Sequence, residues 1–105
     1  MNSESIGYKL LLSYEVNPDS LQDYYQFVTN SYVPAMQAMG LQMSEAWHTA
    51  YGEMPNRLIG FVTDNEENIL SLLQNETWLR LNEQLEAYVT EFSYKVIPYR
   101  GGFQI

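Results

Sequence analysis

Hydrophobic and polar positions divide the chain into four strand-like and two helix-like segments. The strand-like segments are short and rich in apolar, β-branched or aromatic residues, and they cover 8–16, 42–51, 57–63 and about 91–99. The helix-like segments, 17–39 and 64–89, repeat apolar residues at steps of three and four. The pattern therefore predicts the element order βαββαβ.

The second and third strands are expected to form a hairpin around a tight polar turn at 52–55. Alternation places Trp47 and Tyr51 on one face of the sheet and His48 on the other. With a four-residue loop, Trp47 would lie opposite Gly60 and His48 opposite Ile59.

The first helix is expected to begin with Asn17 as its cap and Pro18 at its first position. Pro34 should bend it near Asn30, and Gly40 should end it in a left-handed conformation. Its apolar positions predict one buried face, made of Leu21, Tyr25, Val28, Tyr32, Ala35 and Met39.

The second helical region is expected to open with a capping box between Asp64 and Glu67 and to restart at Asn75. After the restart, Trp78 begins an amphipathic stripe that continues through Leu81 and Leu85. The last strand contains Pro98, which cannot donate to a strand ladder, so this strand should lie at an edge of the sheet.

These elements predict an α+β protein with a ferredoxin-like βαββαβ antiparallel sheet and helices on one face. Residues 8–105 should form a single domain, preceded by a disordered tail at 1–7. The runs Leu10–Leu12 and Leu58–Val62 are apolar on both faces of their strands, although the helices can cover only one. We therefore expect a homodimer in which two open sheet faces pair into a dimeric α+β barrel.

Composition narrows the choice of partners. The net charge is −8, from 13 acidic against 5 basic residues, which disfavours nucleic acid and anionic membrane surfaces. No segment approaches the ~20 apolar residues of a membrane span, and the polar amino terminus does not resemble a signal peptide. The chain contains no cysteine, so disulfides and thiolate chemistry are excluded. We expect a cytoplasmic protein.

His48 is the only histidine, and therefore the only side chain expected to titrate near neutral pH without perturbation. It could act as a general base or an axial ligand, but the simpler interpretation is a structural residue, either hydrogen-bonded in the core or on an edge strand. A single histidine without paired ligands is no metal site. Nine tyrosines and two tryptophans could line a pocket for a flat organic molecule or could be core. The candidates for such a pocket are Tyr14, Tyr25, Tyr32, Trp47 and Tyr51, with Arg57 as a possible partner for a ligand carboxylate.

Three ordered motifs resemble NIPSNAP-like proteins. They are the end of the first helix (Tyr32-Val33-Pro34-Ala35-Met36 running to Gly40), the hairpin (Trp47-His48-Thr49-Ala50-Tyr51-Gly52, then Asn56) and the helix restart (Asn75-Glu76-Thr77-Trp78). This resemblance implies the dimeric α+β barrel fold and a homodimer. Where that family often has charged residues on the first strand, this chain has Leu10 and Leu12.

Two hypotheses for the function follow. In the first, the protein binds a small apolar or aromatic molecule in an aromatic-lined cavity, and it resembles the cofactor-independent monooxygenases that share the barrel. His48 would then be the base, Trp47 and the tyrosines would position the substrate, and no cofactor is expected. In the second, the protein is a non-catalytic dimeric structural or interaction module whose aromatic residues are core and interface. The sequence leaves open whether the protein is an enzyme.

Overall fold

The computed structural model describes residues 6–48 and 57–100 of the chain. Within them, four antiparallel strands form one sheet in the order β2-β3-β1-β4. The two most apolar strands lie at the centre, and the Pro98 strand lies at an edge, as predicted. The strands are β1 (Ile6–Val16), β2 (Gln42–His48), β3 (Arg57–Thr63) and β4 (Val89–Arg100).

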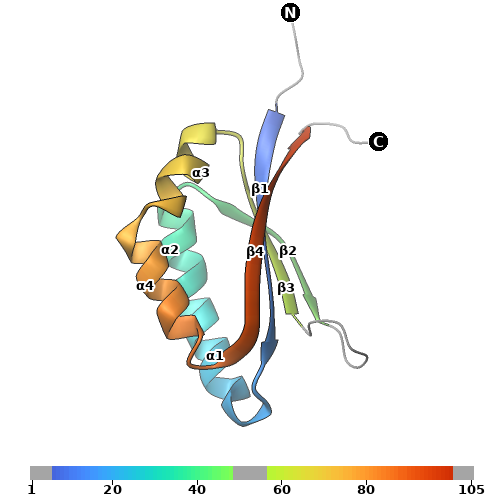
Figure 1. Ribbon diagram of the computed structural model, residues 1–105, viewed down its shortest axis with the longest axis vertical. Helices are drawn as coiled ribbons and strands as arrows, with labels where there is room; N and C mark the ends of the chain where they lie inside the picture. Colours follow the sequence, from blue (N-terminus) through green and yellow to red (C-terminus); the bar gives the residue numbers. More distant parts are fainter. Residues whose placement is uncertain (1–5, 49–56, 101–105) are drawn as a thin grey trace, which may run out of the picture.

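All helices of the described residues pack on one face of this sheet, and the other face is open (Figure 1). This arrangement confirms the predicted ferredoxin-like α+β fold. None of these helices has the length and apolar character needed to cross a membrane. They are η1 (Pro18–Ser20, a 3₁₀ turn), α1 (Leu21–Phe27), η2 (Val28–Tyr32, a π-helical turn), α2 (Val33–Ala38), α3 (Glu66–Leu73) and α4 (Glu76–Leu85).

The buried face of the first helical region differs from the predicted one. Leu21 and Tyr25 are exposed, and the buried positions recur every four residues, at Tyr24, Val28, Tyr32 and Met36. Steps of four drift by about 40° each on a regular α-helix. The wider π turn at η2 offsets this drift. It also lies directly before Pro34, whose ring conflicts with a regular α-helical turn.

The helix ends confirm some of the predicted caps and correct others. Gly40 has a φ of 92° and closes a Schellman motif, in which Leu41 N–H donates to Met36 O at 3.0 Å and Gly40 N–H to Gln37 O at 3.0 Å. The Asn17 side chain makes no capping hydrogen bond, which corrects the prediction for the first helix.

The second helical region also begins differently from the prediction. Asn65, not Asp64, caps α3, because its side chain accepts a hydrogen bond from Glu67 N–H at 2.8 Å. The restart at Asn75 is confirmed, since the Asn75 side chain accepts from Thr77 N–H at 2.7 Å and opens α4.

The pairing of β2 with β3 differs from the predicted register by two residues. His48 lies opposite Arg57 and Trp47 opposite Leu58, while Gly60 faces Glu45. A shift of two preserves the side-chain alternation, so Trp47 and His48 keep the relative faces predicted for them. The register also shifts between Met43 and Glu45, which bends this edge of the sheet. The predicted turn at 52–55 and the predicted end of the strand at Tyr51 lie outside the described residues.

The two faces of β1 differ in character. Leu10 and Leu12 are fully buried against the helices. Leu11, Lys9 and Ser13 alternate to the open face, where Lys9 Nζ forms a salt bridge of 2.8 Å with Glu45 Oε1. The open face is therefore apolar with interspersed charge, and Leu10 and Leu12 do not contribute to it.

Candidate functional site

A cavity of about 320 Å³ lies between the first helical region and the paired strands β2 and β3. Its helical wall comes from α1 and η2, and its sheet wall comes from the side of β2 and β3 that faces the helices. Apolar and aromatic surface predominates, and a few polar side chains are placed among it. The described lining residues are Tyr24, Tyr25, Val28, Thr29, Met43, Ala46, Trp47, His48, Arg57 and Ile59.

Arg57 is the most constrained charged group of this wall. It begins β3, and only 7% of its surface is exposed. Its guanidinium carbon lies 5.7 Å from the ring centre of Tyr24 and 5.5 Å from that of Tyr25. Its Nη2 also donates a hydrogen bond of 3.1 Å to the Tyr25 hydroxyl. The two rings therefore hold the guanidinium in one place beside the cavity.

Two buried tyrosines, Tyr14 and Tyr24, lie near Arg57 and are hydrogen-bonded to each other. The hydroxyls of Tyr14 and Tyr24 share a hydrogen bond of 2.7 Å, and their rings meet edge to face at 5.7 Å. Burial raises the pKa of both hydroxyls, although the nearby Arg57 charge acts in the opposite direction. Both groups therefore stay protonated at neutral pH and fix the position of the Tyr24 ring.

His48 and Trp47 come from the end of β2. His48 is exposed, lines the cavity and lies directly across the ladder from Arg57. Trp47 is 61% exposed, and its Nε1 donates a hydrogen bond of 3.4 Å to Glu45 Oε2. The hydrogen bond from Lys9 holds the pKa of the Glu45 carboxyl below its usual range. The indole thus lies beside an ionised carboxylate at the edge of the sheet.

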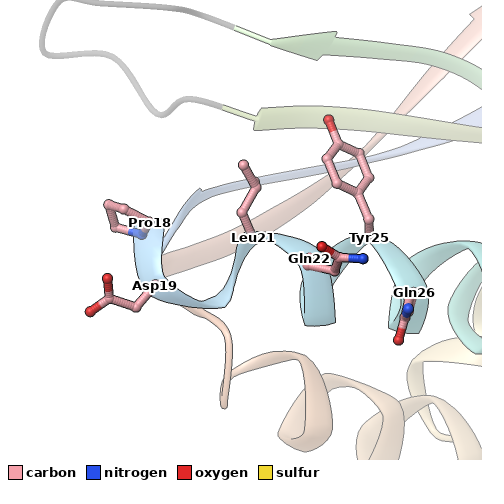
Figure 2. A pocket seen from close by; sticks show the side chains of 6 residues that line it. All are labelled: Pro18, Asp19, Leu21, Gln22, Tyr25 and Gln26. Atoms are coloured by element: carbon pink, nitrogen blue, oxygen red, sulfur yellow. The ribbon is translucent and has the colours of Figure 1, made fainter.

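A second hollow, a groove of about 470 Å³, runs along the start of the first helix (Figure 2). Figure 2 shows Leu21 and Tyr25 pointing from this helix toward β2 and β3, so Tyr25 stands between the groove and the cavity. All the residues that line the groove are exposed, Tyr25 included, and Asp19, Gln22 and Gln26 give it polar walls. Without buried walls it cannot exclude water from a ligand, so the cavity is the stronger candidate site.

The structure brings three of the predicted site side chains together at the cavity, namely Tyr25, His48 and Arg57. Trp47 adjoins the cavity from β2, but its indole bonds Glu45 on the open face of the sheet. Tyr14 lies behind the wall, bonded to Tyr24. The Tyr32 hydroxyl is buried elsewhere and donates to Asn82 Oδ1 at 2.7 Å. Tyr51 lies outside the described residues.

Sequence reasoning missed Tyr24 and Met43 as lining residues. Tyr24 was overlooked because the predicted helical face included Tyr25, and the four-residue repeat through Tyr24, Val28 and Tyr32 was the signal that could have found it. Met43 and Ala46 reach the cavity because β2 lies at the edge of the sheet, which only the strand order reveals. Among residues 6–48 and 57–100, no three acidic or histidine side chains gather as metal ligands.

Comparison of the fold with solved structures finds several close matches. A NIPSNAP domain protein from Burkholderia xenovorans aligns over 86% of this chain and 91% of its own, with a TM-score of 0.64 and 7% identity. A NIPSNAP family protein from Agrobacterium tumefaciens aligns over 92% and 88%, with a TM-score of 0.62 and 14% identity. The chain has the NIPSNAP fold. The NIPSNAP-like architecture predicted from the three sequence motifs is therefore confirmed.

The same fold also occurs in a candidate antibiotic biosynthesis monooxygenase from Nitrosomonas europaea. It aligns over 99% of this chain and 97% of its own, with a TM-score of 0.66 and 10% identity. No protein-family model matches the chain, and no curated protein matches its sequence. Identities this low show a shared fold and do not transfer an activity.

Proposed function

We propose that the protein binds a small, flat aromatic molecule in the cavity between α1 and the β2–β3 pair. The observation that carries the proposal is the composition of the cavity wall, in which Tyr24 and Tyr25 supply aromatic surface and Arg57 and His48 supply polar contacts. Ligand sites are typically concave and mostly apolar, with a few polar groups that orient the ligand. A volume of about 320 Å³ suits a ligand of a few rings.

Binding can be tested by titrating the protein with a panel of naphthalene and quinoline compounds while following tryptophan fluorescence. Trp47 belongs to the strand that lines the cavity, although its indole lies on the open face beside Glu45, whereas Trp78 is buried elsewhere. A ring bound against β2 should therefore change the Trp47 emission. The variant Ala46→Trp fills the cavity from an exposed position and should abolish saturable binding. Leu79→Trp, at an exposed position of α4, is the matched control. Equal binding by both variants, or no saturable ligand, would contradict the proposal.

A second and more specific candidate function is catalysis at the same site, which the position of His48 favours. Its imidazole lines the cavity and could take a proton from an electron-rich aromatic substrate, such as one with an acidic ring methylene. Molecular oxygen would then convert the methylene to a carbonyl, with one oxygen atom becoming the carbonyl oxygen and the other leaving as water with the two methylene hydrogens. This step needs no electrons beyond those of the substrate. A monooxygenase name among proteins of this fold agrees with such chemistry.

The variant His48→Gln separates the two candidates. Glutamine keeps similar size and hydrogen bonding but does not titrate near neutral pH. Oxygen consumption with an anthrone-type substrate should disappear in this variant, while ligand binding persists. If binding is equal in both proteins, shows no pH dependence from about 5 to 8, and oxygen is never consumed, the protein is a non-catalytic binding module.

We also propose that two copies of the chain pair through their open sheet faces. Leu11, Leu58 and Val62 are only half-buried there. The same face carries Lys9 and Lys95 as well as Glu15 and Glu45, so it holds both signs of charge. A two-fold interface places the same surface on both partners, and a face with both signs can be complementary to itself.

A further inference from the structure

We propose that the cavity selects an aromatic carboxylate and that Arg57 holds its acid group. The inference rests on the binding function proposed above and adds the sign of the ligand's charge. It depends on three observations: the distribution of charge around the cavity, the fixed position of Arg57, and the arrangement of the apolar lining.

The charge of the cavity wall is opposite to that of the chain. The chain carries 13 acidic and 5 basic residues, with a net charge of −8. Among the described residues that line the cavity there is no aspartate or glutamate, whereas Arg57 and the only histidine are both present. The nearest acid along β2, Glu45, is held on the open face by Lys9 at 2.8 Å. An anion is thus attracted locally, although the protein as a whole repels it.

Arg57 is organised for this role before any ligand arrives. The rings of Tyr24 and Tyr25, with centres 5.7 and 5.5 Å from the guanidinium carbon, and the hydrogen bond to the Tyr25 hydroxyl restrict the position of the guanidinium. A planar guanidinium matches the geometry of a carboxylate in a way that an ammonium group does not. With the side chain 7% exposed, the surrounding rings exclude most water, which strengthens its field inside the cavity. A ligand would therefore not have to order this side chain on binding.

The remaining walls suit the ring system of such a ligand. Val28 and Met43 provide apolar contact from opposite sides, and Tyr25 offers an aromatic ring. His48 lies across the ladder from Arg57 and adds a second polar contact at the same end of the sheet. A ligand would place its carboxylate toward the start of β3 and its rings along α1 and β2.

The test compares ligands that share one ring system and differ in charge. Naphthoate, naphthamide and naphthylmethylammonium are titrated by calorimetry at low and high salt. Naphthoate should bind roughly ten- to a hundredfold more tightly than naphthamide, as expected for a charge-assisted hydrogen bond. This preference should weaken as salt rises, and the ammonium compound should bind least.

Two matched variants assign the preference to Arg57. Arg57→Gln should remove the difference between naphthoate and naphthamide. Arg80→Gln makes the same change in net charge at an exposed site on α4, where Arg80 faces Glu76 at 3.8 Å, and should keep the difference. Arg57→Lys keeps the charge but loses the planar fork, so it should retain only part of the preference.

The outcomes separate this inference from the proposed function. Equal binding of naphthoate and naphthamide by the parent would overturn the selection for an anion and leave aromatic binding intact. Failure of all three compounds to bind would overturn both. The naphthoate and naphthamide comparison uses the parent protein alone. It therefore remains a test of the inference even if an Arg57 variant does not fold.

Discussion

The indole N–H of Trp78 donates a hydrogen bond of 3.0 Å to the hydroxyl of Tyr32. That hydroxyl in turn donates to Asn82 Oδ1 at 2.7 Å, and all three side chains are buried. Burial raises the pKa of the Tyr32 hydroxyl, which stays protonated and can keep donating. Tyr32, which the sequence suggested as a ligand contact, instead joins the first helical region to α4.

Tyr32→Phe should therefore destabilise the fold although it removes only one oxygen atom. The indole N–H and the Asn82 carbonyl oxygen would each lose a partner in a buried environment. We expect a loss of about 2–4 kcal/mol in the free energy of unfolding, measured by urea denaturation. Tyr25→Phe removes the same atom at a side chain that is 50% exposed, and should cost much less. Equal losses in the two variants would contradict this account.

Trp78→Ala should cost about 3–5 kcal/mol, because it removes a fully buried indole. The ring also packs edge-on against Tyr94, with centres 5.2 Å apart. The adjacent Leu79→Ala is the control, since Leu79 is 48% exposed and should change stability by less than about 1 kcal/mol. Thermal unfolding that leaves the Trp78 variant within a degree or two of the parent would show that the indole contributes little.

Several features of the fold could be predicted from the sequence alone. The Trp78 stripe and the Asn75 restart were predictable, because they depend on local spacing and capping within one helix. The central positions of β1 and β3 followed from their continuous apolar runs. In each case the physical cause lies within a few residues of the feature that it produces.

The phase of the first helix and the hairpin register could not be predicted in the same way. Pro34 predicted a disturbance of the helix near Asn30, where the π turn Val28–Tyr32 lies, but it did not indicate a π turn or the burial of Tyr24 in place of Tyr25. The two-residue difference in the hairpin arose because an assumed loop length fixed the register. For the site, aromatic content suggested a pocket, but the cation–π contacts of Arg57 with Tyr24 and Tyr25 join different elements and could be found only from the fold.

Stability should fall steeply in alkaline solution. Burial raises the pKa of Tyr14, Tyr24 and Tyr32 above the ordinary value of 10.0. The unfolded chain therefore releases these protons near pH 10 while the folded chain retains them. Their stabilising effect is complete below that pH and is lost as the pH rises above it. Each group should contribute a slope of about −1.4 kcal/mol per pH unit to the free energy of unfolding.

Tyr14→Phe provides the check on this pH dependence. Urea unfolding between about pH 10 and 11.5 should give a slope that is shallower by about one proton in this variant. The variant also loses the hydrogen bond to Tyr24, which lowers the free energy of unfolding at every pH. The missing Tyr14 proton is seen as the difference in slope between parent and variant. Parallel curves for the parent and the variant would mean that Tyr14 does not retain its proton in the fold.

Gly40→Ala should be destabilising for reasons of backbone geometry. Gly40 has a φ of 92°, which residues with a Cβ rarely adopt, and an added Cβ would overlap the Asn68 side chain. We expect a loss of about 1–2 kcal/mol or more, measured as a lower melting temperature. Gly60→Ala is the matched control. Its Cβ would meet only the flexible side chains of Ser44 and Glu45, at 3.1 Å, so its loss should be smaller.

The last prediction concerns the proposed homodimer. Light scattering at micromolar concentration should give about twice the mass of the chain, because the open face leaves Leu11, Leu58 and Val62 only half-buried. Covering several hundred Å² of such surface at about 25 cal/mol per Å² would supply several kcal/mol. Leu58→Lys should therefore yield monomers. It introduces a charge on the open face at the inner strand β3, and the helix-facing core is unchanged.

Leu70→Lys is the control for this variant, because Leu70 is 53% exposed on α3, among the helices that cover the opposite face. It introduces the same charge and should remain dimeric. Circular dichroism should show that both variants keep the fold, so that any loss of mass reports the interface alone. A parent protein that is a stable, soluble monomer would refute the pairing, and dissociation of both variants would place the interface elsewhere.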